Sequence, residues 1–539
     1  MSVFVKYTSF LFLILFTISS FRPGNDTPPD HLSATFHQER RNQLRKLLPP
    51  NSVAVFFANP VRNRANDVEY LYHQDPDFYY LTGYQEPHAM LMIFSEDQKN
   101  AQGEAYKELL YVQPKDAMRE MWTGKRQGVE GVKQHLGFTQ VFNNTEFANA
   151  PIDFLGFSKV FFLPFQNDVR DEASVKGDLY DLMAQFKQKV KYPADYNAEA
   201  HQLYELIQQS KADESVNAAQ TIRSYQTTNE RLKEDKILSA YAEAQDAKTR
   251  EEIAKKVPQT NMNGYALDGV MNTLREVKTL EEIKLLRKAI DISAVGQIEV
   301  MKAMHPGMSE KEVQGIHEFV FRKYGAEFEG YPSIVGAGNN GCVLHYIENN
   351  KTKVGTELVL MDLGAEYHGY TADVTRTIPA SGKFTKEQKA IYDLVYRAQE
   401  EGFKLCLTDS SVQAPGRVAR HIINKGLKEL GIIADENERH LYFPHGTSHH
   451  LGLDVHDRSN YGNLKPGMVI TVEPGIYIPE GSKCDKKWWG IAVRIEDDIL
   501  ITEKGYENLS KMAPRKSEEI EALMAKSSVL NKLELPKLD

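Results

Sequence analysis

The chain has 539 residues, of which 41% are hydrophobic and 26% are charged. This length allows two to four domains, and the hydrophobic content is sufficient for their cores. The formal net charge of −9 leaves no broad basic excess to meet phosphates, which argues against a nucleic-acid partner. The three cysteines, Cys342, Cys406 and Cys484, have neither metal-type nor disulfide-type spacing, so we interpret them as buried or free thiols.

Residues 1–20 have the pattern of a secretory signal peptide. Lys6 precedes the apolar run 10–16, Ser19-Ser20 follow it, and the run is too short to span a bilayer comfortably. The pattern predicts a protein that is exported, periplasmic or secreted, without stable membrane insertion once the signal is cleaved. An uncleaved N-terminal membrane anchor is the alternative, because Lys6 alone supplies positive charge and the cleavage site is imperfect.

Residues 31–196 alternate between helical and strand patterns and predict an α/β domain. A basic amphipathic helix is expected at 36–48. Short apolar runs predict strands at 52–57, 89–94, 109–112 and 160–163. Residues 197–268 then become rich in Ala, Glu, Gln and Lys and poor in Gly, which predicts a helical insertion or linker of unknown role.

A second α/β domain is predicted over residues 269–515. Its first helix is expected to begin after Thr279, where Thr-Leu-Glu-Glu has the capping-box pattern. Similar starts occur at Ser309 to Glu312 and at Thr385 to Gln388. Strand-like segments lie between these helices, so we expect helices outside and a rigidly held site on strands inside. Residues 516–539 predict a short helix and a C-terminal tail.

Acidic and imidazole side chains in this second domain form a candidate metal site: Asp362, Asp373, His449, Glu473 and Glu496. Asp362 ends an apolar run, and His368-Gly369 offers a turn before Asp373 on the expected returning strand. The two carboxylates should therefore converge at one end of a hairpin. Glu473 ends the strand-like run 469–472, and sequence alternation would place Glu496 on the same strand face as Arg494.

Four carboxylates and one imidazole make a hard, oxygen-rich ligand set, which suits Mn²⁺, Mg²⁺ or Co²⁺ better than a structural zinc. Bridging carboxylates offset the repulsion between two divalent cations and leave a position for a shared water, whose pKa falls toward neutrality. Most single Asp and Glu side chains are only solvated, so the joint pattern carries the interpretation. It predicts a hydrolase with two divalent metal ions, Mn²⁺ being expected and Co²⁺ or Zn²⁺ being alternatives.

At these residues the chain resembles the aminopeptidase P and prolidase branch of the pita-bread metallopeptidases. The motifs follow in the family's order: DLGAEYHGYTADVTRT, HGTSHHLGLDVHD, TVEPGIYI and VRIEDD. Upstream, SIVGAGNNGCVLHYIENN resembles the aminopeptidase P segment that brings a histidine, here His345, into the active site. DPDFYYLTGYQEPHAMLMIF resembles the N-terminal domain of the same proteins, and the resemblance covers residues 37–195 and 270–510. It implies an α/β (α+β) protein with a creatinase-like N-terminal domain and a pita-bread catalytic domain of two pseudo-symmetric halves.

The resemblance also implies catalytic roles for Glu473 and for side chains beside the ligands. His456 and His345 would hydrogen-bond the substrate carbonyl and the developing gem-diolate, and His445 would line the pocket. Arg494 is expected to orient a ligand carboxylate. Since His449 and His450 are adjacent, the residues alone leave open which one binds metal, and the motif alignment favours His449.

The implied activity is release of the N-terminal residue from peptides with proline in the second position. A metal-bridging hydroxide would be the nucleophile and Glu473 the proton shuttle. Ordinary aminopeptidases bind a bond to proline poorly, because the amide of proline has no N–H and its ring fixes φ. The family commonly self-associates, which implies a homo-oligomer, although the sequence carries no interface signature.

Three alternatives stay open. An Xaa-Pro dipeptidase (prolidase) is the nearest, although Ser448 and the segment 346–349 look more like aminopeptidase P. Methionine aminopeptidase shares the catalytic fold, but it normally lacks a large N-terminal domain. A non-catalytic pita-bread binding protein is the remote alternative, because such proteins lose the ligands that this chain keeps.

Overall fold

The computed structural model describes residues 30–166, 175–532 and 536. The chain divides into residues 1–31 and a compact unit of residues 32–539, and the second unit contains the elements described below. The expected signal peptide lies outside the described residues, so export and the membrane-anchor alternative stay predictions. Within the described residues, no helix has both the length and the apolar character needed to cross a bilayer.

The N-terminal domain is built on a mixed sheet with the strand order β6-β5-β4-β1-β7-β8. The strands are β1 (Ser52–Phe57), β4 (Met90–Lys99), β5 (Ala105–Val112), β6 (Val141–Asn143), β7 (Lys159–Phe162) and β8 (Met262–Asn263), and a hairpin of β2 (Asn63–Ala65) and β3 (Val68–Glu69) stands apart. Its helices are α1 (Ala34–Leu47), α2 (Pro76–Thr82), α3 (Ala117–Thr123), α4 (Gly128–Leu136) and α5 (Leu179–Lys189). The run Ser-Val-Ala-Val-Phe-Phe forms a central strand because nearly all its side chains are buried, as in a strand covered on both faces. The expected helix and strands of this domain are therefore present, with ends shifted by a few residues.

Helices α6 (Ala198–Gln209), α7 (Ser215–Thr228), α8 (Lys236–Glu243) and α9 (Ala247–Ala254) follow and share an apolar core of their own, which includes Leu203, Ile222 and Leu238. Part of the range expected to be helical departs from that expectation. Met262 and Asn263 form β8, which pairs in parallel with β7 at the edge of the N-terminal sheet. The partner strand lies about a hundred positions earlier, so local composition does not indicate this pairing. Helix α10 (Ala266–Arg275) then leads into the C-terminal domain.

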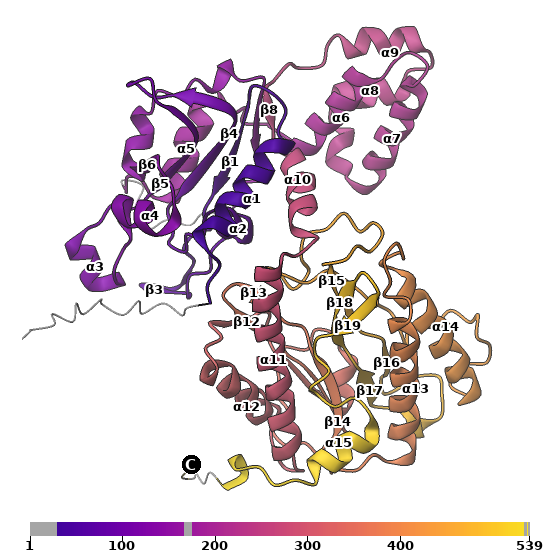
Figure 1. The fold of residues 1–539 in the computed structure, drawn as a ribbon. Helices are drawn as coiled ribbons and strands as arrows, with labels where there is room; N and C mark the ends of the chain where they lie inside the picture. Colours follow the sequence, from indigo (N-terminus) through magenta and orange to yellow (C-terminus); the bar gives the residue numbers. More distant parts are fainter. Residues whose placement is uncertain (1–29, 167–174, 533–535, 537–539) are drawn as a thin grey trace, which may run out of the picture. The chain divides into compact units, whose positions relative to one another are not determined.

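The C-terminal domain, in which the candidate catalytic site is expected, consists of two halves with helices outside and antiparallel strands inside. The first half contains α11 (Leu280–Ala303), α12 (Glu310–Lys323), β9 (Phe328–Glu329), β10 (Ile334–Ala337), β11 (Leu358–Asp362), β12 (Ala365–Tyr367), β13 (Tyr370–Thr371) and β14 (Thr375–Pro379). The second half contains α13 (Lys386–Phe403), α14 (Ala414–Glu429), β15 (Val469–Val472), β16 (Gly475–Ile478), β17 (Ile491–Arg494), β18 (Asp497–Thr502) and β19 (Gly505–Asn508). Figure 1 shows α11 and α12 on one side of these strands and α13 and α14 on the other. This arrangement leaves the strand ends between the helical layers free to carry a site.

The expected capping boxes are confirmed at the starts of α11, α12 and α13. In the first, the Thr279 backbone N–H donates to Glu282 Oε2 at 2.8 Å, and the Glu282 N–H donates to Thr279 Oγ1 at 3.3 Å. Reciprocal bonds of this kind satisfy amides that a helix start otherwise leaves unpaired. The sequence pattern therefore sets where the long covering helices begin.

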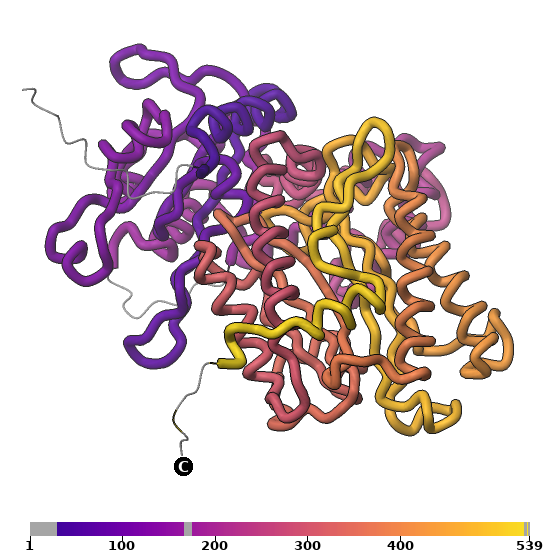
Figure 2. Tube along the Cα trace, turned by 60° about the horizontal axis from the view of Figure 1, so that its bottom comes forward, coloured from indigo at the N-terminus to yellow at the C-terminus, as the bar shows by residue number. Residues whose placement is uncertain are grey.

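The C-terminal segment joins the two halves of this domain. In Figure 2 this yellow segment runs between the rose and orange parts of the tube, and α15 (Ser517–Met524) packs against both α11 and α13. The Tyr392 hydroxyl of α13 donates to the Arg515 carbonyl at 2.6 Å. Arg376, just before the middle of β14, donates from Nε to the Pro514 carbonyl at 3.0 Å. The last part of the chain thus fixes the separation of the halves.

Candidate active site

The candidate ligands lie at strand ends that face one another across the two halves. Asp362 is the last residue of β11, and Asp373 lies two residues before β14. Glu473 follows β15 directly, and Glu496 lies between β17 and β18. Chain position thus places two carboxylates in each half, all at places where the backbone leaves its sheet.

The hairpin between the first two carboxylates has the turn that its sequence indicates. β12 pairs with β13 through Tyr367↔Tyr370, and the intervening His368 and Gly369 have φ values of +51° and +84°. Two positive φ values in succession are typical of a type I′ turn, which glycine accommodates readily. On the neighbouring ladder, Asp362 pairs with Thr375.

One expectation about strand geometry is wrong in detail. Glu496 does not share a strand face with Arg494, because β17 ends at Arg494 and β18 begins at Asp497. The bend places the Glu496 carboxylate beside the Thr375 hydroxyl, which donates to Glu496 Oε2 at 2.6 Å. The side chains of Arg494 and Glu496 nevertheless line the same cavity, although Glu496 belongs to neither strand.

The five candidate ligands gather around one buried point. One ligand atom each from Asp373, His449 and Glu496 lies within 4.8 Å of the others. His449 Nε2 is 3.4 Å from Asp373 Oδ2 and 3.8 Å from Glu473 Oε1. Asp362 joins the group through Tyr331, whose hydroxyl oxygen lies 2.6 Å from both Asp362 Oδ1 and Asp373 Oδ1.

Crowding of buried carboxylates shifts their protonation. Burial raises the pKa of Glu473 to about 7, against the opposing effects of His449 and Arg494. Burial and the neighbouring carboxylates raise the pKa of Glu496 well above its ordinary value. Burial alone would lower the pKa of His449, but Asp373 and Glu473 raise it to about 9. The carboxylates of such a cluster repel one another and so destabilise the folded protein. Cations bound among them would offset this repulsion.

A line of polar side chains connects the cluster to the wall of the cavity. Arg494 donates from Nη2 to Asp362 Oδ2 and from Nη1 to the Tyr477 hydroxyl oxygen at 2.9 Å. That hydroxyl lies 2.8 Å from His445 Nε2. Burial, together with the nearby Arg494 guanidinium, lowers the pKa of His445 to about 4. His445 is therefore a neutral imidazole near pH 7, able to share one hydrogen bond with Tyr477.

The cluster opens into a cavity of about 390 Å³. His345, His445 and His456 line this cavity together with the five candidate ligands and Arg494. The ring of His456 lies 4.2 Å, centroid to centroid, from that of His449 at a steep angle. The structure thus brings together every sequence-predicted site residue around one cavity.

The neighbouring histidines at 449 and 450 point to different places. His449 contacts the carboxylates, whereas His450 is buried away from the cavity and its ring packs edge-on against Tyr461. Burial lowers the pKa of His450 to about 4. The geometry therefore assigns the imidazole of the cluster to His449.

Sequence reasoning missed side chains that complete the site. Tyr331 bridges two ligands, Thr375 supports Glu496, and Tyr461 lines the cavity. Tyr331 precedes Asp362 by some thirty residues, and neither its type nor its spacing distinguishes it from other tyrosines. Thr375 lies in the same motif as Asp373. Its hydroxyl group, so close to a candidate ligand, could have suggested a supporting role.

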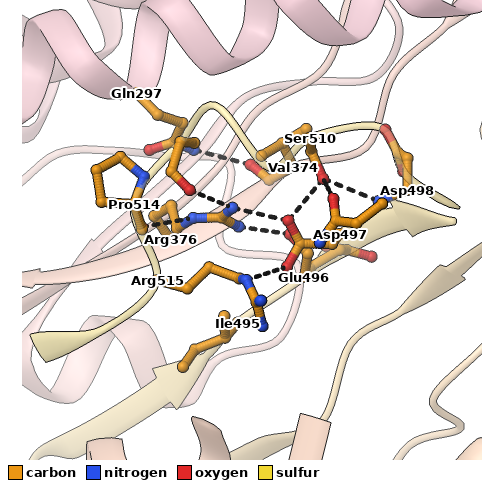
Figure 3. A network of polar contacts seen from close by, with 12 residues as sticks. Gln297, Val374, Arg376, Ile495, Glu496, Asp497, Asp498, Ser510, Pro514 and Arg515 are labelled. Atoms are coloured by element: carbon orange, nitrogen blue, oxygen red, sulfur yellow. Dashed lines mark hydrogen bonds and ion pairs between the residues drawn. The ribbon is translucent and has the colours of Figure 1, made fainter. Parts of the chain in front are cut away.

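A fully buried arginine supports the backbone around Glu496 (Figure 3). Arg376 donates from Nη1 to the carbonyls of Glu496 at 2.6 Å and Thr375 at 2.8 Å. Its Nη2 donates to Asp497 Oδ1 at 2.8 Å. A planar guanidinium can hold several acceptors at fixed angles, so Arg376 locks the bend that carries Glu496 to its neighbours.

The donor set fits divalent cations. Carboxylate oxygens with one imidazole nitrogen are the ligands that Mn²⁺ and related hard ions prefer, and no thiolate lies among the cavity-lining residues. The fold and this ligand set define the class of a metallopeptidase. In agreement, metallopeptidase family M24 matches residues 284–503, and the aminopeptidase P N-terminal domain matches residues 37–159.

Relatives with curated names extend over nearly the whole chain. A Xaa-Pro aminopeptidase of Escherichia coli is 34% identical over 500 residues, which cover 90% of this chain and 97% of the relative. The human Xaa-Pro aminopeptidase 3 is 29% identical over 94% of this chain and 89% of its own length. Among solved structures, aminopeptidase P from E. coli with the inhibitor Pro-Leu has a TM-score of 0.70 at 32% identity, covering 92% of this chain and 98% of that one. The Pseudomonas aeruginosa aminopeptidase PepP reaches a TM-score of 0.72 at 30% identity, covering 92% of this chain and 99% of that one.

This chain belongs to the aminopeptidase P family of M24 metallopeptidases, and it is a metallopeptidase hydrolase. The family and the mixed α/β fold, with an N-terminal domain followed by a pita-bread catalytic domain, are confirmed as predicted. The coarser prediction of an aminopeptidase activity is supported by the same relatives.

Proposed function

We propose that the protein removes the N-terminal residue from peptides whose second residue is proline, using two divalent cations, with Mn²⁺ as the expected metal. The observation that carries the proposal is the convergence of four carboxylates, three of them buried, and His449 on one cavity lined by further histidines. The names of the relatives support the proline specificity. An inhibitor described as Pro-Leu in the E. coli relative also accords with a pocket for prolyl peptides.

Five residues would hold the two proposed ions. Asp362 is connected to Asp373 through Tyr331, and His449 lies close to both Asp373 and Glu473. Asp373 contacts both Tyr331 and His449, and Glu496 lies within 4.8 Å of Asp373 and His449. Asp373 and Glu496 are therefore the candidates for bridging positions. When bound, the metal pair supplies an activated water nucleophile and polarises the scissile carbonyl.

The chain's own residues then handle protons and orientation. Glu473 lines the cavity beside His449, where its carboxylate would take a proton and return it to the prolyl nitrogen. His456 and His345 face the cavity, where an N–H from either would donate to the substrate carbonyl oxygen. Arg494 holds Asp362 in place, since its guanidinium is fixed by Tyr477.

Substrate length tests the proposal against the dipeptidase alternative. The purified enzyme should be incubated with matched Xaa-Pro, Xaa-Pro-Yaa and Xaa-Ala-Yaa peptides, with Mn²⁺ and with a chelator. We expect the tripeptide with proline to be cleaved fastest, the dipeptide more slowly and the alanine peptide hardly at all. Chelation should abolish cleavage, because the carboxylates alone supply no activated water.

An Asp373→Ala variant is the matched control for the metal requirement. Loss of a bridging carboxylate exposes two cations to mutual repulsion, so this variant should lose bound Mn²⁺ and activity together. Full activity in Asp373→Ala would contradict the dinuclear proposal. Faster cleavage of Xaa-Pro than of Xaa-Pro-Yaa would instead favour prolidase.

A further inference from the structure

In the first half of the catalytic domain, one buried glutamine reaches the backbone beside both carboxylate ligands. Gln297 extends from α11, and its side chain is fully buried. Its Nε2 donates to the Met361 carbonyl at 3.1 Å and to the Val374 carbonyl at 2.8 Å. Met361 directly precedes Asp362, and Val374 directly follows Asp373. A single amide group thus spans the two chain segments that present the ligands.

The second half repeats this contact with different residues. Gln399 extends from α13 and is also fully buried. Its Nε2 donates to the carbonyls of Val472 and Ile495, both at 3.0 Å, and also lies 2.9 Å from Asp497 Oδ2. These carbonyls directly precede Glu473 and Glu496. Each covering helix therefore carries a glutamine that joins the backbone beside two ligands of its own half.

The positions of these bonds show what they add to the sheets. The β11–β14 ladder ends at Asp362↔Thr375, so Gln297 joins the strands where their own pairing stops. In the other half, β15 belongs to one sheet and β17 to another. Gln399 therefore bridges two sheets that share no ladder. In both places the amide joins two chain segments that each present a carboxylate.

The two amides differ in what holds their oxygen: among the described residues the Gln297 Oε1 is buried without a hydrogen-bond partner, whereas the Gln399 Oε1 accepts a bond. Arg515 Nη1 donates to Gln399 Oε1 at 2.9 Å, which orients that amide with its N–H groups toward the two carbonyls. Figure 3 shows Gln297 reaching Val374 close to the Arg376–Asp497 network. Burial makes these bonds firm, because a carbonyl that loses its donor inside the core has no water to replace it.

We propose that Gln297 and Gln399 are matched positioning residues, which set the separation of the paired carboxylates and thereby the affinity for the two metal ions. This inference rests on the proposed dinuclear site. It assigns each glutamine to two ligands: Gln297 to Asp362 and Asp373, and Gln399 to Glu473 and Glu496. Neither glutamine lines the cavity: Gln297 acts through two backbone carbonyls, and Gln399 acts through two backbone carbonyls and the Asp497 carboxylate.

Methionine variants test the proposal, because methionine has nearly the same length and volume as glutamine but no N–H. Gln297→Met and Gln399→Met should be prepared metal-free, and Mn²⁺ binding should be measured by calorimetry and by the spin-coupled signal in electron paramagnetic resonance. Removing such indirect support typically weakens metal binding about 10–100-fold. We expect a weakening of that size in each variant, and recovery of kcat at saturating Mn²⁺ with little change in KM.

Gln226→Met is the matched control. Gln226 is buried in the insertion, and its Nε2 donates to the Leu232 carbonyl and to Ser239 Oγ, both at 3.1 Å. This variant also loses two buried hydrogen bonds, so its Tm should fall, yet its Mn²⁺ affinity should equal that of the wild type. If a methionine variant fails to fold, Gln297→Glu and Gln399→Glu preserve shape and polarity while placing an acceptor against the carbonyls, and they should weaken Mn²⁺ binding at least as much.

The outcomes separate this inference from the proposed function. The positioning role would be overturned if the Gln297 and Gln399 variants bound Mn²⁺ within about twofold of wild type. It would also be overturned if Gln226→Met lost as much Mn²⁺ affinity as they do. Either result would leave the dinuclear site intact. A wild-type protein that binds fewer than two Mn²⁺ ions, without a spin-coupled signal, would overturn the proposed site and the inference with it.

Discussion

His317 on α12 is a residue whose protonation state is set by burial. Its side chain is fully buried, and among the described residues neither ring nitrogen has a hydrogen-bond partner. Burial lowers the pKa of His317 to about 3. In an unfolded chain a histidine titrates at about 6.5. Between these values the unfolded state binds a proton that the folded state does not.

This difference predicts acid sensitivity. The folded-state pKa is depressed, so the folded protein is unaffected by His317 above about pH 6.5 and loses stability as pH falls from there toward 3. At about pH 5, protonation of His317 in the unfolded state lowers the free energy of unfolding by about 2 kcal/mol. In His317→Leu, the free energy of unfolding should therefore fall less between about pH 8 and pH 5 than in the wild type. Urea titrations at both pH values measure this.

An exposed histidine supplies the comparison for that experiment. His305→Leu should follow the pH dependence of the wild type, because the His305 side chain lies at the surface. If the free energy of unfolding changed with pH equally in His317→Leu and His305→Leu, the acid sensitivity could not be attributed to the buried His317.

At the residue scale, the sequence and its family resemblance predicted side chains that the fold gathers around one cavity. Asp362 and Glu473 end apolar runs, and Asp373 follows the His368-Gly369 turn, so these positions could be found from sequence pattern. Tyr331 and Gln297 were not identified, because each acts through a contact with a segment more than thirty positions away. Their residue types are ordinary in a strand or a helix. Nothing in the local pattern separates them from residues that only pack.

Among the elements, α10 connects the N-terminal domain with the loop that carries His456. Arg275, its last residue, is fully buried and donates from Nη1 to Asp77 Oδ1 of α2 at 2.6 Å. Its Nη2 donates to Asp457, the neighbour of His456, and Lys278 Nζ donates to the same carboxylate at 2.7 Å. Arg275, Asp77 and Asp457 are buried, and the guanidinium forms ion pairs with both carboxylates. Through these pairs the position of the loop that carries His456 depends on α2 of the N-terminal domain.

Replacing Arg275 should show whether the position of the His456 loop depends on its guanidinium group. Arg275→Met leaves Asp77 and Asp457 buried with weaker compensation, and breaking a buried pair in this way costs about 3 kcal/mol. We expect that loss in urea unfolding together with a lower kcat, since His456 would no longer be held beside His449. Arg287→Met is the control: its bond to Glu507 is part-exposed, so stability should change by less than about 1 kcal/mol and kcat should not change. Unchanged kcat in Arg275→Met would show that Arg275 serves stability alone.

The elements themselves were largely predictable where their signals are local. Capping boxes fixed the starts of α11, α12 and α13, and the His368-Gly369 turn fixed a hairpin. The two-residue strand β8 was missed, and Glu496 was placed on a strand that in fact ends two residues earlier. In both cases the outcome depends on which distant strand offers a partner, and that is decided by the packing of the whole domain.

Across the whole molecule, metal binding should appear as stability. Four carboxylates, three of them buried, lie together with Arg494 and His449, so cations bound among them would favour the folded state over the unfolded one. A ligand at about 100 times its Kd adds about 2.7 kcal/mol. We expect Tm to fall on chelation and to rise again with Mn²⁺, as measured by scanning calorimetry. In Asp373→Ala the Tm should not respond to Mn²⁺, and a response equal to that of wild type would place the stabilising ions elsewhere.

The C-terminal segment that joins the two halves also fixes the order in which the protein can mature. A ribosome adding about 5–20 residues per second needs roughly 7–27 s to proceed from Asp362 to Glu496. During that interval the first pair of carboxylates exists without the second, and the apolar face of β11 and β14 has no opposite half to cover it. Arg376 must wait longer still for the carbonyls of Ala513 and Pro514. A nascent chain therefore passes through a stage of exposed apolar surface, and loading of the proposed metal pair belongs to the time after synthesis is nearly finished.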